Sequence, residues 1–381
     1  MISTVRNFAL AAALLTAFAA PAATLLSATA IPGAPPGARA YAIRYTSTDY
    51  NGRPDAVTGL LIEPKDPAPA GGRPIVAWAH GTTGIGEACA PSGAPTRFSQ
   101  IPGLADMLDR GWVVVATDYA GLGSPGPHPY LVKDATALAV LDSVRAARAH
   151  ASARAGTSFA LWGLSQGGHA ALVSAERARA YVPELTLVGT AAAAPPTDLQ
   201  SNFAAGGKPT TRGVLIAFAS SSWSQVYGAP LATLGPPATV RLIDRLSRIC
   251  VLGHGPKLGT MLGAVALGHR LRGVDVAHLD PWMGLLQRNS ADPRAASAAP
   301  LLIAQSPRDE VVSAPITRTY ARAACTAGAR LRWVAVDSEH AATAKHAERA
   351  TVDWLADRFA GRSAPSDCAA EFEGGPNTKT L

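Results

Sequence analysis

Cysteine, aromatic residues and charge are all scarce in this sequence. Its 381 residues include four cysteines, 6% aromatic side chains and 16% charged side chains. The cysteines form neither a CxxC pair nor a cluster with histidines, which argues against a metal centre. The lysine and arginine residues give a formal charge of +7, but they form no dense run and no pattern with aromatic residues. This distribution argues against nucleic acid as a partner.

The sequence also lacks a fixed repeat, which argues against a solenoid. With 48% hydrophobic residues, the chain suits one large globular domain, alone or with an insertion. Short apolar runs indicate strands buried on both faces, and helical segments lie between them. This alternation predicts an α/β fold, a mostly parallel sheet with helices on both faces. Two strands are expected within 39–65, joined near 51–54, and others over 75–79, 112–116, 159–164, 185–191, 301–304 and 331–336; helices are expected over 104–109, 134–151, 166–182, 314–327 and 341–359.

The first 30 residues have the features of a secretory signal peptide. Arg6 supplies a positive charge before the uncharged apolar stretch 8–18. Small residues suited to signal-peptidase cleavage follow at 17–19 and again at 28–30. Pro21 interrupts the apolar run before it reaches the length of a membrane-spanning helix. We therefore expect cleavage near residue 19 or 30 and a secreted protein, either extracellular or periplasmic.

The regular alternation of strands and helices is interrupted between residues 200 and 299. There, apolar helical segments alternate with Gly- and Pro-rich punctuation, as at 235–237 and 253–256. We interpret 200–299 as a helical cap inserted into a core formed by 31–199 and 300–365. Residues 366–381 are expected to be a C-terminal tail.

Export would place the cysteines in an oxidising compartment, where they would form disulfides. Four cysteines allow three sets of two disulfides, and the sequence alone does not select one of these sets. The four positions are Cys89, Cys250, Cys325 and Cys368.

The most informative motif is Gly163-Leu164-Ser165-Gln166-Gly167, which ends an apolar run. The pattern is typical of the sharp strand–turn–helix of α/β-hydrolases, in which a nucleophilic serine is pushed out of the sheet. Side chains two positions before and after the serine would collide, so glycine is expected at both. The alternative is a tight turn in which the serine is incidental.

A serine nucleophile requires a general base, and the base requires a carboxylate that orients it. In α/β-hydrolases these follow in the order serine, acid, histidine, each after a later strand. Among nine histidines, His340 directly follows an apolar strand and opens a helix, so we assign it as the base. Asp309 follows the preceding strand and is the expected acid, with Glu310 as its nearest rival.

The tetrahedral intermediate would carry an oxyanion that backbone N–H groups must stabilise. One donor is expected to be Gln166, the residue after the nucleophile. The other should come from the loop after the strand that ends at His80-Gly81, where we favour Thr82 over Thr83.

Together, these motifs resemble the secretory lipase family, which includes the fungal lipase A type. The resemblance spans roughly residues 40 to 360, and it implies an α/β-hydrolase fold with a helical cap and a Ser/Asp/His triad. It also suggests a Cys89–Cys250 disulfide, which leaves Cys325 to pair with Cys368. The motifs that carry it are 80–84, 118–123, 125–130 and 163–168, with the surroundings of Asp309 and His340.

We therefore expect a secreted serine hydrolase of carboxylic esters, a lipase or esterase that forms an acyl-enzyme and needs no metal or organic cofactor. Its partner would be an acyl ester or lipid substrate, with peripheral contact to a lipid interface; the oligomeric state is open. An aminopeptidase or an acyltransferase on the same fold, and a non-catalytic binding protein, are the alternatives. The sequence predicts an apolar cap that buries the acyl chain.

Overall fold

The computed structural model describes residues 24–205, 208–251 and 258–373. The described residues include a mixed nine-stranded sheet with the order β1-β2-β3-β5-β4-β6-β7-β8-β9. Its strands are β1 (Leu25–Ala30), β2 (Ala38–Thr48), β3 (Pro54–Pro64), β4 (Arg73–Ala79), β5 (Val113–Thr117), β6 (Ala155–Leu164), β7 (Thr186–Ala193), β8 (Leu301–Gln305) and β9 (Leu331–Ala335).

The sheet divides into an antiparallel edge and a parallel remainder. Strands β1, β2 and β3 pair antiparallel, and β3 pairs antiparallel with β5. From β5 through β4 to β9, every neighbouring pair is parallel. The prediction of an α/β fold with a mostly parallel sheet is therefore confirmed. The carboxyl ends of the parallel strands share one edge, where ligands bind in such sheets.

Helices cover both faces of the sheet. Helices α2, α3 and α9 pack on one face, whereas α1 and α10 pack on the other. Each expected helix is present with its ends shifted by at most two residues. The bounds are α1 (Leu104–Asp109), α2 (Lys133–Ala149), α3 (Gln166–Tyr181), α9 (Ala314–Thr326) and α10 (Thr343–Phe359).

The apolar run of β4 shows why a central strand needs hydrophobic residues at successive positions. Ile75 and Ala77 contribute to the core beneath α2 and α3. Val76 and Trp78 contribute to the opposite core, which α1 and α10 complete. Because side chains alternate between the two faces of a strand, a run buried on both sides has no polar position.

The strand β1 was not expected from the sequence. It pairs with β2 at the outer edge, where Ala28 lies opposite Ile43. Its side chains are mostly exposed, so the segment has no continuous apolar run. Cleavage after Ala30 would remove this strand, whereas cleavage after residue 19 would retain it. The apolar stretch 8–18 of the signal segment precedes the described residues, and cleavage at either position stays a prediction.

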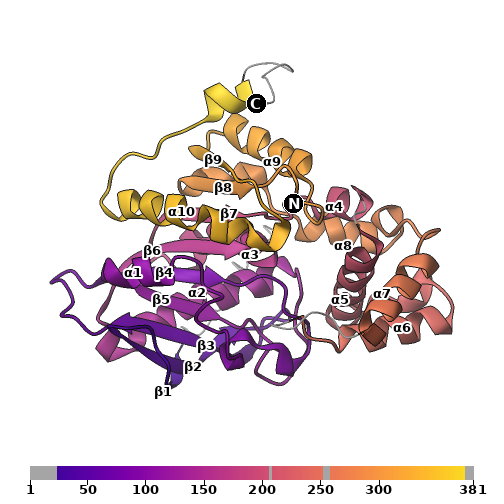
Figure 1. Ribbon diagram of the computed structural model, residues 1–381, viewed down its shortest axis with the longest axis horizontal. Coiled ribbons are helices and arrows are strands. Elements are labelled where there is room, and N and C mark those ends of the chain that lie inside the picture. Colours follow the sequence, from indigo (N-terminus) through magenta and orange to yellow (C-terminus); the bar gives the residue numbers. More distant parts are fainter. Residues whose placement is uncertain (1–23, 206–207, 252–257, 374–381) are drawn as a thin grey trace, which may run out of the picture.

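Helices also dominate the segment between β7 and β8, in which the sequence places the cap. They form their own apolar core, which includes Phe218, Trp223 and Trp282. Figure 1 shows α5, α6 and α7 grouped together beside the sheet. The name cap is kept for this segment, whose boundaries remain those proposed from the sequence. Its helices are α4 (Leu199–Ala205), α5 (Pro209–Tyr227), α6 (Pro237–Ser247), α7 (Leu258–Arg270) and α8 (Trp282–Asn289).

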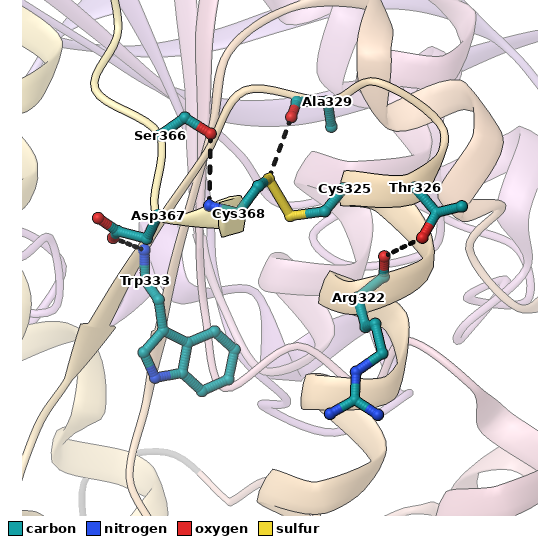
Figure 2. Close-up of a disulfide and its surroundings, with 8 residues drawn as sticks. All are labelled: Arg322, Cys325, Thr326, Ala329, Trp333, Ser366, Asp367 and Cys368. Atoms are coloured by element: carbon teal, nitrogen blue, oxygen red, sulfur yellow. Dashed lines mark hydrogen bonds between the residues drawn. A yellow bond between two sulfur atoms is a disulfide. The ribbon is translucent and has the colours of Figure 1, made fainter. Parts of the chain in front are cut away.

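Two disulfides join distant parts of the chain, in the pairing that the family resemblance suggested. Cys89 pairs with Cys250, and Cys325 pairs with Cys368. The first connects the loop after β4 to the cap. Figure 2 shows the second, which links the end of α9 to the C-terminal segment.

The C-terminal segment is held in place beyond its disulfide. The Asp367 carboxylate accepts a hydrogen bond from the Trp333 N–H at 2.8 Å, and the Asp367 N–H donates to the Leu331 carbonyl at 2.7 Å. The residues expected to form a tail therefore begin with a segment that is hydrogen-bonded to the backbone of β9. Residues beyond 373 lie outside the described part of the chain.

No helix within the described ranges has both the length and the apolar character needed to cross a bilayer.

Removing the Cys325–Cys368 disulfide is expected to destabilise the fold. The cross-link closes a loop with a sequence separation of 43 residues. Chain-entropy estimates for such a loop give about 4 kcal/mol of stabilisation through the unfolded state. We expect the Cys325→Ala/Cys368→Ala variant to unfold at a clearly lower urea concentration, measured by far-UV circular dichroism. An unchanged midpoint would show that the hydrogen bonds of Asp367 suffice.

Candidate active site

Ser165 lies at the junction of β6 and α3, in a strained backbone conformation. Its φ of 55° and ψ of −118° lie outside the regions that serine normally adopts. The Ser165 N–H donates to the Ala193 carbonyl at 2.8 Å, which fixes the turn against β7. Strained residues of this kind persist when the surrounding structure determines them, and they cluster at functional sites.

Two glycines make this turn sterically feasible. A Cβ atom at Gly163 would lie 2.0 Å from the Gly167 carbonyl oxygen. A Cβ atom at Gly167 would lie 1.8 Å from the Ala79 carbonyl oxygen at the end of β4. In both cases the obstacle is backbone, which cannot rotate away. The spacing of glycines around Ser165 therefore follows from backbone packing.

Ser165, His340 and Asp309 form a continuous hydrogen-bonded chain. The His340 Nε2 atom lies 2.8 Å from the Ser165 Oγ atom, and its Nδ1 atom lies 2.7 Å from an Asp309 carboxylate oxygen. With Nδ1 protonated and donating to Asp309, Nε2 is free to accept the serine proton. The structure thus brings together the three residues that the sequence selected.

Buried hydrogen-bond donors surround the Asp309 carboxylate, whose side chain is 0% exposed. Its Oδ1 atom accepts from the N–H groups of Val311 at 2.9 Å and Val312 at 2.8 Å. Its Oδ2 atom also accepts from the Gln305 amide at 3.2 Å. These bonds stabilise a buried negative charge and fix its orientation toward His340.

The rival carboxylates point elsewhere. Glu310 is exposed and pairs with Lys208. Asp337 is also exposed and pairs with Arg308 at 2.5 Å. The Ser306 hydroxyl donates to the Ser338 carbonyl at 2.5 Å, which ties the loop of Asp309 to the loop of His340.

Each of the two expected oxyanion donors lines a cavity that Ser165 also lines. Thr82 lines one cavity with Ser165 and His340, and Gln166 lines a second cavity with Ser165. No described residue accepts a hydrogen bond from the backbone N–H of Thr82 or Gln166. Thr83 is buried and lines neither cavity, so the geometry favours Thr82 between the two.

Two residues that hold this region were missed in the sequence. The His128 Nδ1–H group donates to the Ala120 carbonyl at 2.9 Å, which leaves Nε2 to accept from the Gln166 amide at 3.0 Å. Burial lowers the pKa of His128 to about 3, so its imidazole is neutral near pH 7. The Tyr130 hydroxyl lies 2.8 Å from the Thr82 hydroxyl. Both residues fall within the 125–130 motif, but no sequence pattern indicates their partners.

His80, which precedes the oxyanion loop, makes contacts that hold the fold together rather than contacts with Ser165. His80 is buried, and its Nδ1 atom lies 2.6 Å from the Gly81 carbonyl oxygen. Burial lowers the His80 pKa and raises that of Asp118 nearby. Asp118, just after β5, accepts hydrogen bonds from Thr58 on β3 and from Ser92 in the loop after β4, so it joins these segments. His169, on α3, instead contacts the Asn289 carbonyl at the end of α8 at 2.7 Å.

Ser165 lies between two cavities of different size. The larger has a volume of about 360 Å³, and its lining is mainly apolar, including Val214, Phe218 and Met261 from the cap. The smaller has a volume of about 60 Å³ and lies among residues of α4 and α5, with Tyr130 and Val312. No group of three or more histidine, cysteine or acidic side chains in the described ranges is arranged to hold a metal ion.

The sheet order, the serine turn and the order of the three side chains define an α/β-hydrolase fold. Among solved structures, the chain superposes on Candida antarctica lipase A in its closed state with a TM-score of 0.75. The two share 17% identity, and the alignment covers 91% of this chain and 84% of the other.

Sequence comparison relates the chain to one family of α/β-hydrolases. The secretory lipase family model matches residues 98–227, which confirms the resemblance to that family. A probable inactive lipase of Mycobacterium tuberculosis is 26% identical over 340 residues, covering 84% of this chain and 73% of the relative. Lipase A of Arthroderma benhamiae is 24% identical over 358 residues, covering 87% and 73%, respectively. These similarities support a hydrolase of the lipase/esterase type.

The backbone contact at Gly167 predicts a large effect of a single methyl group. Gly167→Ala would force apart α3 and the end of β4, so we expect a loss of at least about 3 kcal/mol in the free energy of unfolding. Gly284→Ala, in α8, is the matched control because a Cβ atom there meets nothing within 4 Å. It should change stability by less than about 1 kcal/mol, and upward. Similar denaturation midpoints for the two variants would contradict the steric argument.

Proposed function

We propose that this protein is a secreted serine hydrolase that cleaves carboxylic esters through an acyl-enzyme. The observation that carries the proposal is the hydrogen-bonded chain from Asp309 through His340 to Ser165. An imidazole held by a buried carboxylate is the arrangement that makes a serine hydroxyl nucleophilic at neutral pH.

The first half-reaction forms the acyl-enzyme. Ser165 Oγ bonds to the ester carbonyl carbon while its proton passes to His340 Nε2, and the N–H groups of Thr82 and Gln166 stabilise the oxyanion. The bond to the alcohol oxygen then breaks, and His340 gives its proton to the leaving alcohol. In the second half-reaction, water replaces serine as the nucleophile, the acid leaves, and Ser165 regains its proton.

The lining of both cavities favours an ester over a peptide with a free amino end. An aminopeptidase needs an acidic group to bind the substrate ammonium, and neither cavity has an acidic residue in its described lining. The larger cavity is lined mainly by apolar side chains, which suits hydrophobic ester substrates.

An exposed apolar strip on α7 supports contact with a lipid interface. Met261, Leu262 and Val265 are 47%, 62% and 39% exposed, and Val251 nearby is 41% exposed. Met261 and Val251 also line the larger cavity, so the strip borders its entrance. Large apolar side chains gathered at the mouth of a site are typical of interaction surfaces.

Export is supported by the disulfides. Both cysteine pairs are cross-linked, which suits an oxidising compartment such as the periplasm or the extracellular space. The apolar stretch 8–18 that would direct export precedes the described residues.

Ser165→Ala should abolish both ester hydrolysis and covalent labelling by a fluorophosphonate probe, because it removes the nucleophile.

Substitutions at Asp309 and Glu310 should show which of these two carboxylates orients His340. Asp309→Asn should lower kcat by about 10⁴-fold, because the amide no longer selects the reactive tautomer of His340. Glu310→Gln is the matched control and should retain activity within about twofold, because Glu310 is exposed and faces Lys208.

Labelling of wild-type protein that disappears in Ser165→Ala would distinguish this chain from its relative named as inactive. Absence of labelling in folded wild-type protein would instead favour the non-catalytic alternative.

The α7 strip predicts a difference between emulsified and dissolved substrates. Leu262→Glu should reduce activity on an emulsion of tributyrin, a short-chain triglyceride, by about 10-fold, from the lost burial of one leucine side chain. Activity on dissolved 4-nitrophenyl acetate should be unchanged, because Leu262 does not line either cavity. In protein that retains β1, Leu26→Glu is the matched control, since Leu26 is 49% exposed on that strand. Equal losses on both substrates would argue against an interfacial role.

A further inference from the structure

The two cavities that meet at Ser165 differ in their access to His340. His340 lines the larger cavity, together with Thr82 and Ala341. The lining of the smaller cavity includes Gln166 but not His340. Both cavities therefore reach the nucleophile, whereas one of them reaches the proton donor.

This difference indicates which cavity holds the alcohol portion of an ester and which holds the acyl portion. The leaving alcohol must receive its proton from His340 Nε2, so its oxygen has to lie within hydrogen-bond reach of that atom. The alcohol portion consequently occupies the larger cavity, and the acyl portion extends into the smaller one. Since cap residues also line the smaller cavity, the cap would still bury the acyl portion in this assignment.

The smaller cavity favours a short acyl group. A volume of about 60 Å³ corresponds to roughly two to four water-sized groups. This space suits a short acyl chain of about four non-hydrogen atoms beyond the carbonyl carbon. Leu199, Phe203 and Ile216 contribute apolar walls.

One cation lines this cavity, whose other polar side chains are those of Ser165, Gln166, Asn202 and Tyr130. Arg212, in the first turns of α5, borders the smaller cavity. Its Nε–H group is buried and has no hydrogen-bond partner. Within the described residues, no side chain forms an ion pair with its guanidinium. The residue as a whole is half-buried, and its buried Nε–H group stays unsatisfied unless an acceptor, such as an anion, completes the hydrogen bonding.

We propose that the smaller cavity is a subsite for short acyl groups that end in a carboxylate, which Arg212 binds. The substrates would be half-esters of short dicarboxylic acids, with an apolar alcohol in the larger cavity. A planar carboxylate matches the donor geometry of a guanidinium and would supply the counter-ion that the described chain lacks. This inference rests on the proposed serine mechanism and specifies its substrate class.

The test compares two esters of equal size in the acyl portion. Monobenzyl malonate ends in a carboxylate, and benzyl 3-methylbutanoate replaces its two oxygens with methyl groups. Release of benzyl alcohol gives kcat/KM for each ester with the full-length secreted protein. We expect the wild type to prefer the malonate by at least about 10-fold, as a charged hydrogen bond allows.

Arg212 variants show whether the guanidinium causes this preference. Arg212→Met should lose at least about 10-fold on the malonate and change by less than threefold on the neutral ester, whereas Arg212→Lys should retain part of the preference. The two esters differ in intrinsic reactivity. This difference cancels when the ratio of their kcat/KM values in a variant is compared with the same ratio in the wild type. A reversed ester, carboxymethyl 3-methylbutanoate, carries its carboxylate on the alcohol side and has an acyl group that fits the smaller cavity, so its cleavage should show no dependence on Arg212.

Three outcomes would overturn the proposal. They are a wild-type preference for the neutral ester, an equal loss on both esters in Arg212→Met, and an Arg212-dependent preference for the reversed ester. If neither benzyl ester were cleaved and the fluorophosphonate left Ser165 unlabelled, the serine mechanism itself would fail. Cleavage of the neutral ester without a malonate preference would refute the subsite alone.

Discussion

Close packing of backbone against backbone at the serine turn is the constraint on which the site depends. Gly167 lies so near the end of β4 that even a methyl group would overlap the Ala79 carbonyl. The same contact sets α3 against the sheet, and the α3 N-terminus carries Gln166. The reactive hydroxyl and one oxyanion donor are therefore positioned by a single steric fit rather than by separate interactions.

The remaining parts of the site reach Ser165 because the parallel strands end at one edge. Asp309 follows β8 and His340 follows β9, and the Ser306 hydroxyl joins their loops through the Ser338 carbonyl. Buried donors hold the Asp309 carboxylate, so its orientation does not depend on solvent. A rigid acid then fixes the imidazole, and the imidazole fixes the direction in which the serine proton leaves.

The sequence predicted those parts whose signals are local. The buried strands appear as continuous apolar runs, and the serine turn appears as a spacing of glycines. Asp309 and His340 were selected by their order after successive strands, which a parallel sheet brings to one edge. In contrast, β1 has no apolar run because it is an exposed edge strand, so its existence depends on backbone pairing with β2.

Contacts between distant segments explain what the sequence did not reveal. His128 meets Gln166, and Tyr130 meets Thr82, across 38 and 48 positions of the chain. Arg212 was likewise unremarkable in sequence, because a single arginine in a helix is ordinarily a solvated surface residue. Its surroundings become informative only when α5 packs over the serine turn.

The core and the cap contribute different parts of the site. The core supplies the nucleophile, base and acid from strand ends whose positions the sheet determines. The cap supplies Arg212, Phe203 and Leu215 to the smaller cavity and Val214, Phe218 and Met261 to the larger one. Substitutions in the cap can alter which ester fits while leaving the strand ends untouched. A relative could therefore retain the fold and the reaction and yet accept a different acyl group, because the two are encoded in different segments of the chain.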